Sequence, residues 1–196
     1  MKKSLFIWLS LGLIFTLYLI IPEPQLPPKD LPDSPKSDLN DDTRHMKDVI
    51  AYYTNRYRAE VMPYYLDQMD NSPFLNLALP NIVINHPPEY AQTVFFDTKQ
   101  SYYLEEIVHP FKSTLFVNGY EWENDVFTSK SSREQYVQEF EGVVYNSKVT
   151  LRWVNSNPLV RIAIFWAAWG IFLASGKILT NEISDFFRFI KNNVIK

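Results

Sequence analysis

The sequence predicts an α+β protein, with an external domain of mainly antiparallel sheet and flanking helices that is held by two transmembrane helices. Apolar residues concentrate in two runs, Leu5–Ile21 and Leu159–Leu179, one toward each end of the 196-residue chain. Between them, short segments rich in β-branched and aromatic residues alternate with turn-forming residues, which is typical of a sheet. The apolar share of 46% is too high for a disordered chain.

The first apolar run, Leu5–Ile21, contains no charged residue and follows Lys2 and Lys3. As a helix it is about 25 Å long, at the short end of what crosses a bilayer. A cleaved signal peptide has the same basic start. This run is longer than the apolar region of a usual signal peptide, however, and large, Pro-flanked residues follow it where small ones would mark a cleavage site. Residues 1–21 are therefore predicted to be an uncleaved signal anchor.

The second apolar run follows Asn157 and Pro158, which suit the N-cap and the first position of a helix. Its 21 residues make a helix of about 31 Å, close to the thickness of the hydrocarbon core. Arg161 and Lys177 lie near its opposite ends, where long cationic side chains can extend to the headgroups. A buried core helix is the alternative. Residues 158–179 are predicted to be a second transmembrane helix.

Four small residues share one face of this predicted helix: Ala163, Ala167, Gly170 and Ala174. Small residues allow close packing of helices in lipid, so we expect this face to contact another helix. The other helix is either the first span, through Gly12 and Thr16, or another copy of the chain.

The charges predict the orientation in the membrane. Residues 22–157 contain 12 Lys and Arg against 20 Asp and Glu, whereas the rest of the chain contains 7 against 2. Because basic residues near a span stay on the cytoplasmic side, we expect both termini to be cytoplasmic in the plasma (inner) membrane. Residues 22–157 are then external or periplasmic. The predicted interface anchors are Lys2, Lys3, Arg161, Lys177, Arg188 and Lys191.

Two segments next to the spans have their own character. Six prolines in residues 22–42 predict an acidic, extended spacer. Residues 180–196 place apolar side chains at helical spacing among cations, which predicts an amphipathic helix in the headgroup plane. Docking of this helix on a cytoplasmic partner is the alternative.

Residues 43–157 are predicted to form the external α+β domain. A helix is expected from Thr43 to the break at Pro63, with Tyr53, Tyr57 and Tyr64 on its apolar face, and a short helix to Met69. Strands are expected at residues 81–84 and 93–96, while residues 101–108 suit either a helix or a strand. Asn118-Gly119 predicts a hairpin turn between residues 115–117 and 120–122. A short helix over residues 131–140 and a second hairpin over residues 143–154 follow.

The residues that carry chemistry give no enzyme signature. The lack of cysteine excludes disulfides and thiolate sites. His86 and His109 with nearby glutamates lack the spacing of a metal motif. Glu121, Glu123 and Asp125 fail the calcium-loop pattern and are expected on the solvent face of a strand. We therefore expect no catalytic residue, no metal ligand and no cofactor.

The predicted function is protein–protein contact by the external domain, in a subunit of, or an assembly factor for, a membrane complex. Expected partners are membrane lipid and other membrane or envelope proteins, including copies of the same chain, and not nucleic acid. One alternative is an external ligand-binding or sensory module that acts through a partner. A second is a glycan-directed enzyme with paired carboxylates. The candidate partner or ligand surface comprises Tyr53, Tyr57, Tyr64, His86, His109 and Trp122.

Overall fold

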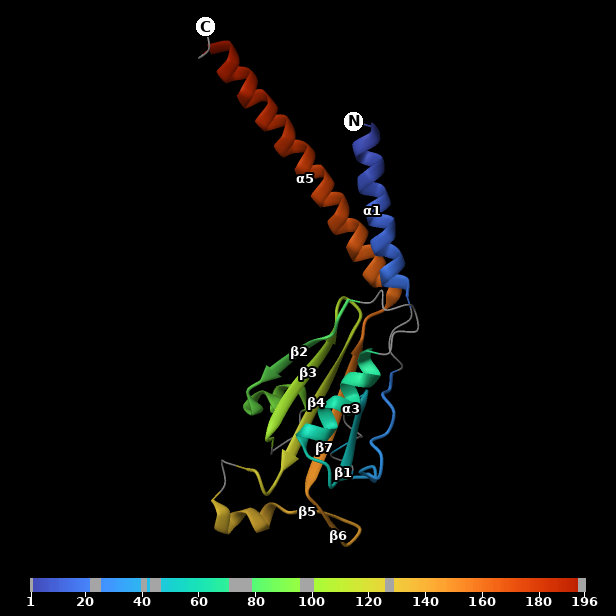
Figure 1. The fold of residues 1–196 in the computed structure, drawn as a ribbon, viewed down its shortest axis with the longest axis vertical. Coiled ribbons are helices and arrows are strands. Elements are labelled where there is room, and N and C mark those ends of the chain that lie inside the picture. The colour runs from blue at the N-terminus through green and yellow to red at the C-terminus, as the bar shows by residue number, and fades with distance from the viewer. Residues whose placement is uncertain are drawn as a thin grey trace. The chain divides into compact units, whose positions relative to one another are not determined.

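The computed structural model describes residues 2–21, 26–39, 42, 47–70, 79–95, 101–125 and 129–193 (Figure 1). The chain divides into two compact units. Residues 21–156 form the first, which we call the sheet unit. Residues 1–20 and 157–196 form the second, which we call the helical unit.

A five-stranded antiparallel sheet is the centre of the sheet unit. Its strand order is β1-β7-β4-β3-β2, and every neighbouring pair is antiparallel. The strands are β1 (Val49–Thr54), β2 (Ile82–His86), β3 (Tyr103–His109), β4 (Ser113–Glu121) and β7 (Ser147–Asn155). A separate two-stranded sheet contains β5 (Gln138–Phe140) and β6 (Val143–Tyr145). The predicted α+β class with an antiparallel sheet is thus confirmed.

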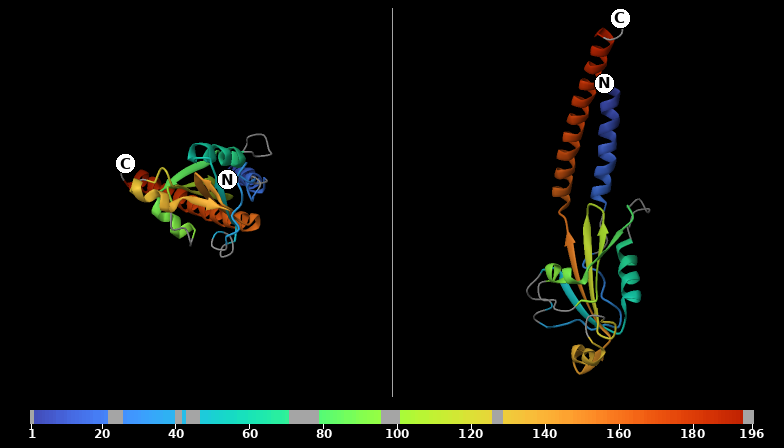
Figure 2. Two further views of the ribbon diagram at one scale, coloured as in Figure 1. Left: turned by 90° about the horizontal axis from the view of Figure 1, so that it is seen from below. Right: turned by 90° about the vertical axis from the view of Figure 1, so that its left-hand side faces the viewer.

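Helices cover both faces of the five-stranded sheet (Figure 2, left). Helix α3 (Arg58–Asp70) packs on one face through Val61, Tyr65 and Met69. The alternation of side chains along each strand brings Tyr52, Ile107, Leu115, Val117 and Leu151 to this same face, and they form the main core. The 3₁₀-helix η1 (Pro88–Tyr90) and helix α4 (Ala91–Val94) cover the other face, where Ala91 and Phe95 pack on Leu104.

The helix predicted from Thr43 is wrong over residues 49–54, whereas the helix expected up to Met69 is confirmed from Arg58 onward. Residues 49–54 form strand β1, and α3 runs without a break through Pro63. The apolar residues at helical spacing also satisfy an alternating pattern. Ile50 and Tyr52 point to the core face of the sheet, and Tyr53 to the other. Thr43 itself lies outside the described residues.

The hairpin predicted at Asn118-Gly119 is also wrong, because β4 continues through both residues. The ring of Tyr103 lies against Gly119, where an added Cβ would be 2.1 Å from the ring atom Cε1. Glycine is needed here for close approach of a neighbouring side chain and not for a turn. The turn into β4 lies at residues 110–112, where Phe111 has a positive φ of 62°.

Other elements differ in detail from the sequence predictions. Residues 91–94 are helical, not extended, whereas the ambiguous residues 101–108 contain strand β3. The predicted helix at residues 131–140 is a 3₁₀-helix, η2 (Lys130–Tyr136), followed by β5. Strands β6 and β7 form as predicted but do not pair with each other, since β6 pairs with β5, and β7 with β1 and β4.

The Pro-rich segment is part of the sheet unit where the structure describes it. Leu31 is buried in the main core, and the Tyr52 hydroxyl donates a hydrogen bond of 2.9 Å to Asp30 Oδ1. Backbone hydrogen bonds join Ser37 to Ala51 and Tyr53 to Pro35. Residues 35–37 thus cover the outer edge of β1. The predicted spacer does not stand clear of the domain over residues 26–39.

One lysine links the two ends of the sheet unit. Lys112 Nζ donates a hydrogen bond of 3.1 Å to the carbonyl of Ile21, and the Lys112 carbonyl accepts one of 3.1 Å from the Ser156 N–H. The first and last residues of the unit are therefore held beside the turn between β3 and β4.

In the helical unit, α1 (Lys2–Ile20) and α5 (Pro158–Asn193) form an antiparallel pair (Figure 2, right). The ring centroids of Phe15 and Phe165 are 4.9 Å apart, and those of Trp8 and Phe172 are 5.7 Å apart. Earlier residues of α1 therefore meet later residues of α5. A Cβ on Gly12 would lie 3.0 Å from atoms of Trp166 and Trp169, so the absence of a side chain lets these rings approach α1.

Helix α5 is the one described helix that is long and apolar enough to cross a membrane, by length and composition, over Pro158–Ile190. The apolar part of α1, Phe6–Ile20, is shorter. Helix α5 contains 36 residues, which corresponds to about 54 Å. It continues without a break through residue 180, so one helix replaces the two predicted on either side of residue 179.

We predict that Gly119→Ala lowers the free energy of unfolding of the sheet unit by about 1–3 kcal/mol, because the added methyl overlaps the Tyr103 ring. Urea unfolding of the full chain in detergent, followed by tryptophan fluorescence, measures this loss. Introducing Gly119→Ala into a Tyr103→Val background is the control, and there the methyl costs much less. If Gly119→Ala lowers the free energy of unfolding equally in both backgrounds, the contact with Tyr103 is not the reason that residue 119 is a glycine.

Candidate interaction site

The two edges of the five-stranded sheet differ. Residues 35–37 hydrogen-bond along the outside of β1 at one edge. Strand β2 forms the other edge, and among the described residues it pairs only with β3. An edge strand presents unpaired backbone N–H and C=O groups on its outer side, and these can pair with another chain.

Strand β2 exposes three consecutive apolar side chains. Ile82 is 53% exposed, Val83 45% and Ile84 39%. Because successive side chains of a strand point to opposite faces, the exposed apolar surface covers both faces of this edge. Most soluble proteins avoid an apolar edge of this kind, since it promotes association. Its presence here identifies β2 as a candidate contact surface.

Hydrogen bonds at both ends hold β2 in place on β3. His86 Nε2 lies 2.8 Å from Glu106 Oε2, and Glu106 Oε1 accepts a hydrogen bond of 3.0 Å from the Thr114 hydroxyl. At the other end, Asn81 Oδ1 lies 2.9 Å from His109 Nδ1, and Asn81 Nδ2 donates to Asp70 Oδ1 at 2.6 Å. The exposed edge is therefore preformed, which lowers the entropic cost of binding to it.

A cavity of about 410 Å³ lies at the C-terminal end of β2. It is lined by Arg58, Asn85, His86, Pro87, Pro88, Tyr102 and Tyr103. A peptide paired with β2 would extend along the strand toward this end. The cavity has the size and the mixed aromatic and polar lining of a site for one side chain or a small molecule.

Two carboxylates fix Arg58 at the wall of this cavity. Glu105 accepts a hydrogen bond from Arg58 Nε, and Glu121 Oε1 accepts one of 2.6 Å from the Arg58 backbone N–H. Arg58 is the first residue of α3, so Glu121 also satisfies a free N–H at the helix N-terminus. The Arg58 side chain is 47% exposed, whereas that of Glu105 is only 6% exposed.

Tyr103 lies beneath Arg58, whose guanidinium carbon is 5.8 Å from the ring centroid. Burial raises the pKa of Tyr103, and the Glu121 and Glu105 carboxylates raise the pKa further, whereas Arg58 lowers it. Tyr103 therefore stays a neutral phenol at physiological pH. Its hydroxyl has no hydrogen-bond partner among the described residues.

The residues predicted for a partner surface lie in different places. Tyr53 is 3% exposed and stacks on Phe140, and His109 is 2% exposed. The hydroxyl groups of Tyr57 and Tyr64 donate to Glu123 and to the Asp30 carbonyl. The half-buried Trp122 donates from Nε1 to the Tyr145 carbonyl. Of the six, only His86 lines the cavity.

The carboxylates also differ from expectation. Glu121 and Asp125 are buried, so the predicted solvent face for the three acids is wrong for these two. For Glu121 the cause is its hydrogen bond with the Arg58 N–H at the start of α3. No group of three His, Asp or Glu side chains that could hold a metal ion occurs among the residues that the structure describes.

The four small residues of α5 are exposed, and Gly170 has open space around it. The contact with α1 instead uses Phe165, Trp166, Trp169 and Phe172. Of the predicted interface anchors, Arg161 is buried, Lys177 is exposed and Arg188 pairs with Asp185. Lys2, Lys3 and Lys191 lie in helices, and their side chains lie outside the described ones.

The sequence contained one signal for the β2 surface that the partner prediction missed. Ile82, Val83 and Ile84 are apolar without alternation, so apolar side chains face both sides of the sheet. Such a strand is either central and covered on both faces or exposed at an edge. Which of the two applies depends on the strand order, which the sequence does not show.

No protein-family model, curated protein or solved structure matches this chain. The candidate site therefore rests on the geometry of the sheet unit alone.

We predict that Arg58→Ala destabilises the protein by about 1–3 kcal/mol, because it leaves the buried Glu105 carboxylate without its partner. The matched control is Arg56→Ala, which removes ion pairs with the exposed carboxylates of Asp33 and Glu60 and should cost at most about 1 kcal/mol. Urea unfolding of both variants provides the comparison. Equal losses would contradict a structural role for the Arg58–Glu105 pair.

Proposed function

We propose that this chain is a two-span membrane protein whose external sheet unit binds an extended segment of a partner protein along β2. The observation that carries the proposal is the asymmetry of the sheet edges. The chain covers one edge with its own residues 35–37 and leaves three apolar residues exposed at the other. Addition of a partner strand to β2 would satisfy the free backbone groups and bury these side chains.

The pairing of α1 with α5 supports two spans. Phe15 lies level with Phe165, and Trp8 with Phe172. The same antiparallel register puts Lys3 level with Lys177. Along α5, the step of 16 residues from Arg161 to Lys177 corresponds to about 24 Å, and long cationic side chains extend this span toward the headgroups. Because α1 packs along the side of α5, α1 crosses the bilayer if α5 does.

The links at Lys112 agree with a hairpin anchor. Ile21 follows α1 directly, Ser156 precedes α5 by two residues, and both hydrogen-bond to Lys112. The two connections to the helical unit therefore leave the sheet unit at one place. The basic residues next to the outer ends of the two helices favour cytoplasmic termini, and therefore an external position for that unit. A docking subunit or assembly factor of a membrane complex needs an external domain that is anchored to the membrane in this way.

A second candidate function is binding of a small ligand in the cavity beside Arg58 and His86. The unpartnered Tyr103 hydroxyl and the aromatic wall favour it. A ligand confined to the cavity would not depend on Val83, which does not line it.

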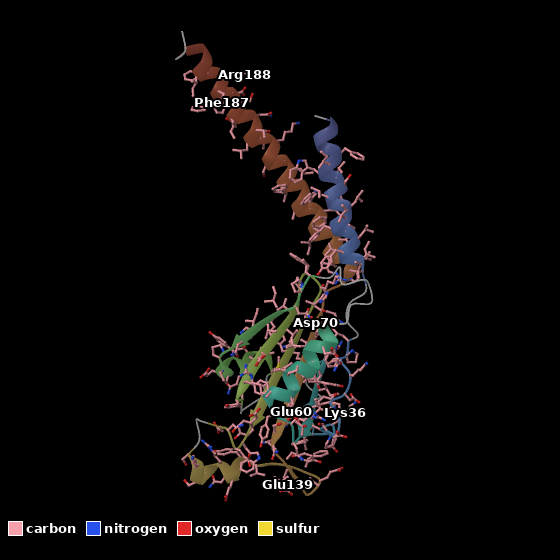
Figure 3. The ribbon with its side chains drawn as sticks, in the orientation of Figure 1. Lys36, Glu60, Asp70, Glu139, Phe187 and Arg188 are labelled. Atoms are coloured by element: carbon pink, nitrogen blue, oxygen red, sulfur yellow. The ribbon has the colours of Figure 1, made fainter. Side chains whose placement is uncertain are left out.

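We predict that a photo-crosslinking residue at Ile84 gives a discrete adduct with another protein in native membranes. Val83→Lys should lower the adduct yield at least about tenfold, because a charge on the edge opposes strand addition. The matched control is Val143→Lys, which alters an equally exposed valine on β6. A photo-crosslinker at Glu139, labelled in Figure 3, controls for random contact.

Equal adduct yields from the Val83 and Val143 variants would contradict docking on β2. Because both valines are about half exposed, neither lysine should reduce the stability of the fold. Thermal unfolding of the two variants checks this condition.

A further inference from the structure

Helix α5 carries an apolar stripe that is longer than α1. The residues of the stripe are separated alternately by four and three positions, which is the pattern of a coiled-coil seam. The stripe comprises Phe165, Trp169, Phe172, Gly176, Leu179, Ile183, Phe186 and Ile190. Its first three members contact Trp8 and Phe15 of α1.

The second half of this stripe is uncovered. The register of the pair places Lys3 of α1 level with Lys177, so the described residues of α1 contact α5 on the part before Leu179. Beyond this part, Leu179 is 61% exposed, Ile183 47% and Phe186 61%. We call residues 179–193 of α5 the tail. Figure 3 labels Phe187 and Arg188 in it.

Lipid is unsuited to cover the tail. Helix α5 is continuous, so the tail follows the axis of the membrane-spanning part and does not turn into the headgroup plane. The 16 residues from Lys177 to Asn193 extend about 24 Å past the last cation of the apolar run. Polar and charged residues occupy the side of the helix opposite to the stripe in this part: Asn181, Asp185 and Arg188. The exposed apolar face of the tail therefore needs a protein partner.

We propose that a second copy of the chain covers this face, and that the two tails pair in parallel along Leu179, Ile183, Phe186 and Ile190. Two copies in one membrane have the same orientation, so their tails are parallel and at the same height. A two-fold axis then brings identical positions together, as in a parallel coiled coil. The inference shares with the proposed function only the assumption that α5 crosses the membrane.

Continuity with the α1–α5 contact supports this partner. The side of α5 that faces α1 is the side that forms the seam beyond it. Two α1–α5 pairs can assemble with the stripe side of each α5 facing inward. Beyond the N-terminal end of α1, the two α5 stripes then meet directly. Glu182, Asp185 and Arg188 lie at least about 100° around the helix from Ile183, so the pairing buries none of these charges.

The absence of native cysteine allows a direct test. Single cysteines are introduced at each position from 179 to 190 of the full chain, and native membranes are treated with a mild oxidant. We expect disulfide-linked dimers to peak at positions 179, 183, 186 and 190, and to be several-fold weaker at 181, 184 and 188. Cysteines at Ala163, Ala167 and Gly170 test the small-residue face in the same way.

Peaks confined to the small-residue face, or uniform crosslinking along the tail, would overturn the proposal. A second measurement uses Ile183→Glu and its neighbour Ser184→Glu, which changes the same charge outside the stripe. Subunit counting by stepwise photobleaching of the labelled protein should show dimers for Ser184→Glu and monomers for Ile183→Glu. The same dimer fraction in both variants would contradict pairing through the stripe. Neither result depends on whether β2 binds a partner.

Discussion

The contact between the Tyr103 ring and Gly119 is the constraint on which the sheet unit depends. Strand β4 is the middle strand of the sheet, and it passes straight beneath the ring because residue 119 has no side chain. The ring in turn lies below the Arg58 guanidinium at the start of α3. Glu105 and Glu121, from β3 and β4, hold that arginine from both sides. One close approach thus connects the centre of the sheet, the position of the helix that covers its core, and the wall of the cavity at the end of β2.

The sequence predicted the α+β class of the protein and its apolar helices, but not how the strands are ordered or which side chains come together. Long apolar runs and the β-branched middle segments are local signals, and both indicated the observed elements. The turn predicted at Asn118-Gly119 was wrong because glycine serves two purposes that look alike in sequence. It can form a turn, or, as here, it can leave room for a ring from the neighbouring strand. Helical spacing around Tyr53 misled because a strand satisfies it too. The open edge at Ile82–Ile84 was not predictable, because strand order is set by contacts distant in sequence.

The helical unit adds a second constraint, which is the difference in length between its two helices. Aromatic side chains of α5 pack on α1 around Gly12, and this contact uses the face opposite to the small residues. The apolar part of α1 is matched by the first half of α5 alone. The remainder of α5 keeps the same apolar stripe without a partner among the described residues. Membrane insertion and self-association would then both follow from the apolar residues of α5. Lipid would surround the first half of the helix, and a second copy of the chain would cover the stripe of the second half.

The central claim is that both helices cross the membrane and that the sheet unit lies outside. Labelling of single cysteines with a membrane-impermeant maleimide tests it most directly, at Lys3, Lys29, Lys130 and Asn181. In intact cells, Lys29→Cys and Lys130→Cys should react, whereas Lys3→Cys and Asn181→Cys should react only after the membrane is permeabilised. Reaction of Lys3→Cys in intact cells, with Asn181→Cys still protected, would contradict the account, because α1 would then lie outside with the sheet unit and α5 would be the only span.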